Sequence, residues 1–150
     1  MGRRLRRALR PRLVLDTGAI IGLERRDYRA VRQIRAAAKR GLLIVVPTTV
    51  VMEAYAGARS PARLNQVLKA IDVELPLVPA ISHQVHVLLR RAGTGSETDA
   101  IVVLEAIEVP GSAVLTDDPD DIHALIEAAG VHGRIPVLTV TRQTAVRSPR

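Results

Sequence analysis

The segment LVLDTGAII at residues 13–21 decides the fold, because it places a single acidic residue between two apolar runs. Its first three residues form a short apolar run that is typical of a buried parallel strand. Asp16 follows directly, and residues 17–23 continue apolar. A carboxylate in such a position is costly to bury unless it is paired or bound to a metal. The segment therefore predicts a central strand that ends in an acid at the boundary of the core.

Outward from this segment, apolar runs alternate with amphipathic stretches along the chain. Helix-length connections between strands favour a mostly parallel sheet with helices on both faces, which is an α/β fold. The predicted strands are residues 13–15, 42–46, 73–78, 113–116 and 136–140, and the predicted helices are residues 27–40, 47–54, 61–70, 81–91, 100–107 and 119–129. The sequence Ser96-Glu97-Thr98-Asp99 resembles a capping box ahead of the 100–107 helix.

Composition limits the possible functions. A chain of 150 residues with 47% hydrophobic and 25% charged residues is ordinary for one globular domain. It has no cysteine, which excludes a disulfide framework, thiolate catalysis and a cysteine metal site. Two Tyr, no Phe and no Trp leave little surface for stacking nucleobases, so any nucleic acid must be held mainly by charge and shape.

The net charge of +7 is concentrated at the two ends. Residues 1–12 hold six Arg and residues 142–150 hold three, whereas residues 13–141 hold 13 basic groups against all 15 acidic ones. We therefore expect a basic N-terminal extension at 1–12, a folded domain at 13–141 and a basic tail at 142–150. Such ends attract phosphate backbones or are simply solvated. The Arg-rich helix within residues 25–40 has the same two interpretations: an RNA-facing surface or a solvated face.

The chain has no sequence signal for a membrane. Only three apolar residues separate the Arg-rich start from Asp16, which is too short for a signal-peptide core or a membrane span. We therefore expect no membrane partner and a cytoplasmic location.

Acidic residues at four places stand out on the predicted fold, with Asp117 and Asp118 sharing one of them. In open α/β sheets the reactive crevice lies at the carboxyl ends of the strands. Asp16 follows the first strand, and Asp117 and Asp118 follow the 113–116 strand. Glu53 and Asp99 lie in largely apolar helical segments. We interpret these acids as lying in apolar settings and as candidates for one metal site.

Each of these acids also has a purely structural interpretation. Asp118 precedes Pro119 and suits a helix N-cap, and Asp99 suits a cap or the helix dipole. Glu53 suits an ion pair with an arginine, and Asp16 suits a turn closed with Thr17-Gly18. The remaining acids are expected to be solvated charges, namely Glu105, Glu108, Asp120, Asp121 and Glu127.

Four blocks of the sequence carry a family resemblance: LVLDTGAII at 13–21, VPTTVVME at 46–53, TDA at 98–100 and VLTDDPDDI at 114–122. In this order and spacing they resemble the PIN domain, and specifically VapC-type toxins of toxin–antitoxin pairs. The resemblance covers about residues 13–140. It implies a Rossmann-like three-layer fold, Mg²⁺ or Mn²⁺, endoribonuclease activity on RNA, a homodimer and a cognate VapB-type antitoxin.

The resemblance also assigns residues. It implies that Asp16, Glu53, Asp99 and Asp118 bind the metal and act in catalysis, with the hydroxyl of Thr116 beside them. Asp117 occupies the variable place between Thr116 and Asp118, so it is a second possible ligand. The Arg-rich start lies outside the family's usual pattern.

Elementary electrostatics agrees with a hard divalent cation. Neighbouring carboxylates repel one another, and oxygen ligands favour Mg²⁺ or Mn²⁺ over zinc. Such an ion promotes attack of water on a phosphodiester, which yields 5′-phosphate and 3′-hydroxyl ends.

Two other functions are alternatives to this nuclease. One is a non-catalytic PIN-like module that binds nucleic acid or protein. The other is a metal-dependent phosphatase. It lacks support because Asp16 is followed by Thr17-Gly18, so the first strand is not followed by the Asp-x-Asp pattern of a phospho-aspartyl mechanism.

Overall fold

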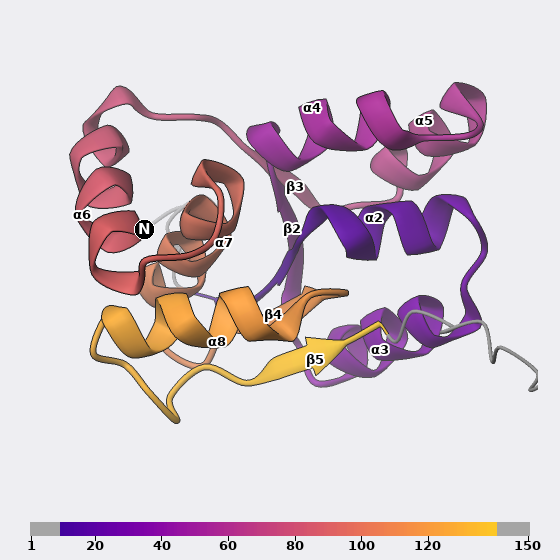
Figure 1. Cartoon of the computed structure of the whole chain (residues 1–150). Coiled ribbons are helices and arrows are strands. Elements are labelled where there is room, and N and C mark those ends of the chain that lie inside the picture. Colours follow the sequence, from indigo (N-terminus) through magenta and orange to yellow (C-terminus); the bar gives the residue numbers. More distant parts are fainter. Residues whose placement is uncertain (1–9, 141–150) are drawn as a thin grey trace, which may run out of the picture.

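A five-stranded, fully parallel sheet forms the centre of the protein (Figure 1). The structure, a computed structural model, describes residues 10–140. The strands are β1 (Arg12–Leu15), β2 (Leu43–Pro47), β3 (Val73–Leu75), β4 (Ala113–Thr116) and β5 (Val137–Thr139), in the order β3-β2-β1-β4-β5. The parallel sheet confirms the predicted α/β class.

Helices cover both faces of this sheet, as predicted (Figure 1). One layer contains α2 (Thr17–Glu24), α3 (Tyr28–Lys39), α4 (Thr48–Gly57) and α5 (Pro61–Lys69), in which α2 contacts the other three helices. The other layer contains α6 (Ser82–Ala92), preceded by the 3₁₀ turn η1 (Pro79–Ile81), with α7 (Glu97–Glu108) and α8 (Pro119–Ala128), all in mutual contact. This is the three-layer arrangement of a Rossmann-like fold.

The strand order creates a switch point between β1 and β4. From β1 the chain continues to β2 on one side, whereas from β4 it continues to β5 on the other. The connections therefore diverge at the carboxyl ends of these two neighbouring strands. In open α/β sheets this is where a ligand crevice forms. Asp16 and Asp117 are the first residues after β1 and β4.

Branched aliphatic residues fill the core in place of aromatic ones. Leu13, Val14 and Leu15 are fully buried in β1, and Val14 is in register with Val45 of β2 and Val114 of β4. Full burial of such a side chain contributes roughly 1.5–3 kcal/mol. The continuous apolar strand explains why β1 occupies the centre of the sheet.

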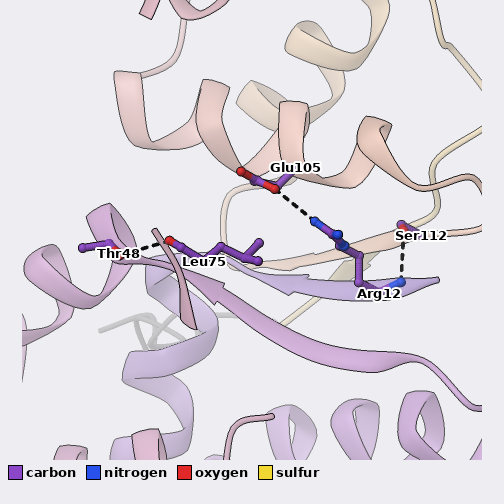
Figure 2. A network of polar contacts seen from close by, with 5 residues as sticks. All are labelled: Arg12, Thr48, Leu75, Glu105 and Ser112. Carbon is purple, nitrogen blue, oxygen red and sulfur yellow. Dashed lines mark hydrogen bonds and ion pairs between the residues drawn. The ribbon is translucent and has the colours of Figure 1, made fainter. Parts of the chain in front are cut away.

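The first strand begins at Arg12, which we had expected to belong to the basic extension. Arg12 is buried, and its Nη1 lies 3.0 Å from Glu105 Oε2 (Figure 2). Its backbone N–H donates to Ser112 Oγ at 3.0 Å. The expectation that Glu105 is solvated is therefore wrong. Burial raises the pKa of Glu105 more than the charge of Arg12 lowers it. Residues 1–9 of the predicted extension, the whole predicted tail 142–150 and residue 141 lie outside the described residues.

The third strand is shorter than predicted, because it ends at Leu75 rather than at residue 78. Pro76 follows directly and has no backbone N–H to continue the ladder. The hydroxyl of Thr48 donates to the Leu75 carbonyl at 3.0 Å, which ties the end of β3 to the start of α4 (Figure 2). Within residues 10–140, no helix combines the length and the apolar character needed to cross a bilayer.

Candidate active site

Asp16 is the buried centre of the candidate site. It is 5% exposed and is the N-cap of α2. Its Oδ1 accepts from the backbone N–H of Thr17 at 2.8 Å, and its Oδ2 accepts from the Thr116 hydroxyl at 2.7 Å. The hydroxyl of Thr116 lies beside Asp16, whereas Thr17 and Gly18 begin helix α2 and do not form the separate turn that we considered. Asp16 is thus held by the ends of both central strands.

The environment of Asp16 disfavours its charge. Burial raises the pKa of Asp16 to about 6, although the bonds from Thr116 and Thr17 lower it. The negative charges of Asp99 and Asp117 raise this pKa further. Three of the candidate acids therefore interact electrostatically at the switch point. A carboxylate so placed is stabilised by any nearby positive charge.

Glu53 joins the site from α4 but does not lie in the apolar setting that we predicted. It is exposed, because Val50, Val51 and Ala54 occupy the inward face of α4. Its Oε2 accepts from the Thr17 hydroxyl and its Oε1 accepts from the Thr98 hydroxyl, each at 2.7 Å. The ion pair with an arginine that we considered is not found among the described residues. Glu53 instead links α2 to α7.

Asp99 has the capping role that its sequence context indicated. Its Oδ2 accepts from the Ser96 N–H at 2.9 Å, and its own N–H donates to Ser96 Oγ at 3.1 Å, which completes the capping box. Burial raises the pKa of Asp99, and the charges of Asp121 and Glu53 raise it further. Capping uses only one carboxylate oxygen, so it leaves Oδ1 available to a ligand.

Asp121 belongs to the electrostatic surroundings of this site, contrary to the expectation of a purely solvated charge. Its carboxylate accepts from the Thr94 hydroxyl, and its charge acts on Asp99. Asp121 belongs to α8, and Thr94 lies in the loop that precedes α7. The acid therefore connects this loop to the helix after β4.

Asp117 and Asp118 have different surroundings. The negative charge of Asp117 raises the pKa of Asp16, and the Asp117 side chain occupies the space beside Gly18. A Cβ added at Gly18 would lie 2.0 Å from Asp117 Oδ1, so this close approach requires glycine. Asp118 is exposed and is the N-cap of α8, but its side chain makes no capping bond. Its backbone N–H donates to Thr116 Oγ1 at 3.0 Å. The structure therefore brings Asp117, rather than Asp118, to Asp16.

Two hydroxyl groups of the site were not among the predicted residues. Thr17 and Thr98 both donate to Glu53, so they orient its carboxylate. Each is adjacent in sequence to a candidate acid, Asp16 or Asp99. That adjacency is the only sequence signal for them, because a threonine hydroxyl has no periodic pattern of its own.

The donor chemistry suits a hard cation, although the present arrangement does not enclose one. Within residues 10–140, no group of three or more His, Cys, Asp or Glu side chains has the arrangement of a metal site. Both oxygens of Glu53 accept from threonines, and one oxygen of Asp99 caps a helix. Carboxylate oxygens nevertheless fit Mg²⁺ or Mn²⁺, and the mutual repulsion of these acids is what a cation relieves. Each Glu53 oxygen accepts one hydrogen bond and keeps a second lone pair, which a cation could use.

No protein-family model matches the sequence, and a search of curated proteins finds no match either.

Proposed function

We propose that this protein is a Mg²⁺- or Mn²⁺-dependent endoribonuclease, the toxin of a VapC-type pair with a PIN-domain fold. One observation carries the proposal: Asp16, Asp99 and Asp117 interact electrostatically where the two central strands end. The switch point of a parallel sheet is the usual place for a reactive site. Acids that repel one another there destabilise the free protein and suit a divalent cation.

The chain's own residues divide the work in this proposal. Asp16, Glu53, Asp99 and Asp117 would hold the ion, with Asp118 as the alternative to Asp117 that the sequence resemblance favours. When bound, the ion supplies Lewis acidity and neutralises charge on the scissile phosphate. Thr116 and the Thr17 N–H fix both oxygens of Asp16, so this carboxylate has a defined orientation before any ligand arrives.

Asp99 has one oxygen free for a second role, that of proton acceptor when Asp16, Glu53 and Asp117 hold the ion. Its raised pKa brings it closer to the range in which a carboxylate is an effective general base. Its Oδ1 makes no hydrogen bond to the described residues. The water that Asp99 deprotonates bonds through its oxygen to phosphorus. The bond from phosphorus to the 3′ oxygen breaks, the 3′ oxygen takes up a proton from solvent, and Asp99 releases its proton to solvent. The products are 5′-phosphate and 3′-hydroxyl ends.

The partners proposed with this activity follow from the family resemblance. They are the RNA substrate, a VapB-type antitoxin that blocks the site and a second copy of the chain in a homodimer. The proposed location is the cytoplasm.

The test compares the purified chain with single isosteric variants in Mn²⁺ on a cellular RNA pool, followed by mapping of the new RNA ends. Asp16→Asn, Glu53→Gln and Asp99→Asn are expected to abolish cleavage, whereas Glu108→Gln, an exposed change at the end of α7, keeps it. New 5′-phosphate ends that persist with Asp16→Asn contradict the mechanism. Asp117→Asn and Asp118→Asn identify the fourth acid, because only the true ligand abolishes cleavage.

A second candidate function is a non-catalytic module that binds nucleic acid or protein. It is favoured by the engagement of Glu53 with two threonines and by the lack of a three-ligand group within residues 10–140. This function predicts RNA binding that neither Mn²⁺ nor the acid variants change, together with no cleavage by the wild-type chain.

A further inference from the structure

An open groove of about 960 Å³ adjoins the candidate active site. Thr17, Gly18 and Asp117 belong to both, since they line this groove and also surround Asp16 or Glu53. The groove also includes residues of the turn from α2 to α3, where three arginines and a tyrosine lie within five consecutive positions: Arg25, Arg26, Tyr28 and Arg29. A cavity of this volume is within the range that holds a small ligand or a short chain segment.

The arginines give this groove a charge opposite to that of the acids beside it. Arg25, Arg26 and Arg29 are all exposed. Of the three, only Arg25 forms an ion pair with a described residue, with its Nε 4.0 Å from Glu24 Oε2. Asp27 also lines the groove, but its carboxylate accepts from the Arg29 backbone N–H and caps α3. Guanidinium groups with free donors are suited to bind phosphate oxygens.

Arg26 adopts a backbone conformation that favours glycine. Its φ of 57° is the only positive φ of a non-glycine residue in the described part of the chain. A side chain in this region costs conformational energy, and such strain is common in segments that bind ligands. The turn therefore keeps a basic side chain at a position where glycine fits the backbone better.

Tyr28 adds an aromatic surface to the same groove. It is 69% exposed, which is the largest exposure among the exposed large hydrophobic residues of the described chain. The Arg32 guanidinium carbon lies 5.7 Å from the centre of its ring. The other tyrosine, Tyr55, is less exposed, and its hydroxyl donates a hydrogen bond to Asn65 Oδ1. An open ring beside arginines matches the stacking platform of proteins that bind single-stranded nucleic acid.

We infer that this groove binds the single-stranded RNA segment next to the scissile phosphate, with Arg25, Arg26 and Arg29 on backbone phosphates and Tyr28 stacked on an unpaired base. The inference rests on the proposed function, because it assigns the course of the same substrate away from the acids. It also refines the sequence-based expectation that nucleic acid is held mainly by charge and shape. One tyrosine at the entrance to the site supplies a stacking surface.

Stacking is tested by the fluorescence anisotropy of a short labelled single-stranded RNA in chelator, where metal-dependent cleavage is suppressed. Tyr28→Ala is expected to weaken binding about tenfold, and Tyr28→Phe to retain it, because stacking needs the ring and not the hydroxyl. Tyr55→Ala is the matched control and leaves the affinity unchanged. The fully paired duplex of the same sequence should bind Tyr28→Ala and wild type equally. Equal affinity of Tyr28→Ala and wild type for the single strand overturns the stacking assignment.

The phosphate contacts are tested by the salt dependence of the same binding. Each lost contact should reduce the slope of log affinity against log salt by about 0.7. Arg25→Ala, Arg29→Ala and Arg26→Gly are each expected to show this change, and Arg26→Gly does so without disturbing the left-handed backbone. Arg35→Ala removes an equal charge from an exposed position of α3 outside the groove and keeps the wild-type slope. Unchanged slopes in all three groove variants overturn the inference.

Cleavage assays in Mn²⁺ separate this inference from the proposed function. A wild-type chain that binds RNA through the groove but never cleaves it refutes the nuclease while supporting the groove. A chain that cleaves RNA, with groove variants that bind and cleave like wild type, refutes the groove while supporting the nuclease.

Discussion

Replacement of Asp16 by Asn should stabilise the metal-free protein at neutral pH. The pKa of Asp16 rises from 3.8 to about 6 on folding, chiefly because the carboxyl is buried. Folding therefore disfavours the ionised form, which is the form present in the unfolded chain above pH 4. At about 1.4 kcal/mol per pKa unit, this shift costs about 3 kcal/mol of unfolding free energy at pH 7.5. Because Asp16 is 5% exposed, solvent screening reduces this cost little.

The substitution removes this cost but weakens hydrogen bonding. An amide cannot accept on both sides, so the Asp16→Asn change weakens one of the bonds that Asp16 accepts from Thr17 and Thr116. Loss of one such bond costs about 1–2 kcal/mol. The expected net effect is a gain of about 1–2 kcal/mol at pH 7.5. Near pH 4 the folded carboxyl is already protonated, so the gain should disappear.

The direction in which stability changes with pH gives the sharpest form of this prediction. The folded state binds a proton more tightly than the unfolded state, so wild-type stability from this group rises as pH falls from 6 towards 4. Urea unfolding in chelator at pH 4.5 and 7.5 measures it, with Glu108→Gln as the exposed control. If Asp16→Asn loses more than about 1 kcal/mol at pH 7.5, hydrogen bonding rather than burial dominates and the reasoning fails.

Two further changes test the geometry and the charge of the chain. Gly18→Ala should destabilise the protein by about 1–3 kcal/mol in thermal or urea melts and reduce cleavage, because the new Cβ displaces the Asp117 side chain. In an Asp117→Gly background the same change should be neutral, and an equal cost there means that the clash lies elsewhere. Deletion of residues 1–9, which contain four Arg, should flatten the salt dependence of RNA binding while leaving Arg10 bonded to the Gly41 carbonyl. An identical slope shows that these arginines do not contact the RNA.

The fold was predictable because its signals are local and strong. Short apolar runs separated by helix-length segments favour a parallel sheet, and the β4 strand was predicted to its last residue. Errors arose where a charged residue is buried. Arg12 enters β1 because Glu105, far away in the sequence, neutralises it. No pattern around Arg12 alone distinguishes a buried, paired arginine from a solvated one.

From the sequence, the site could be predicted only where its residues directly follow a strand. Asp16 follows a buried strand directly, so its position was clear from the sequence. Asp117 and Asp118 were not distinguishable, because consecutive residues at the end of a strand point in different directions and the exact exit decides which acid turns inward. The prediction that Glu53 lies in an apolar setting was wrong, because residues next to one another in the sequence of a helix point to different faces of that helix. Only the packing of α4 determines which face is buried.

Acids and arginines make opposite contributions to RNA binding in the proposed function. The charges of Asp16, Asp99 and Asp117 repel a phosphate as well as one another, so in chelator they oppose binding. The arginines of the groove have the opposite effect and act without metal. Affinity in chelator therefore combines the attraction of the groove and the basic ends with the repulsion of the acids, whereas the increase on adding Mn²⁺ depends on the acids alone. Asp16→Asn should improve affinity in chelator and abolish the Mn²⁺ increment, while Tyr28→Ala should lower affinity equally in both conditions, because stacking is independent of the ion.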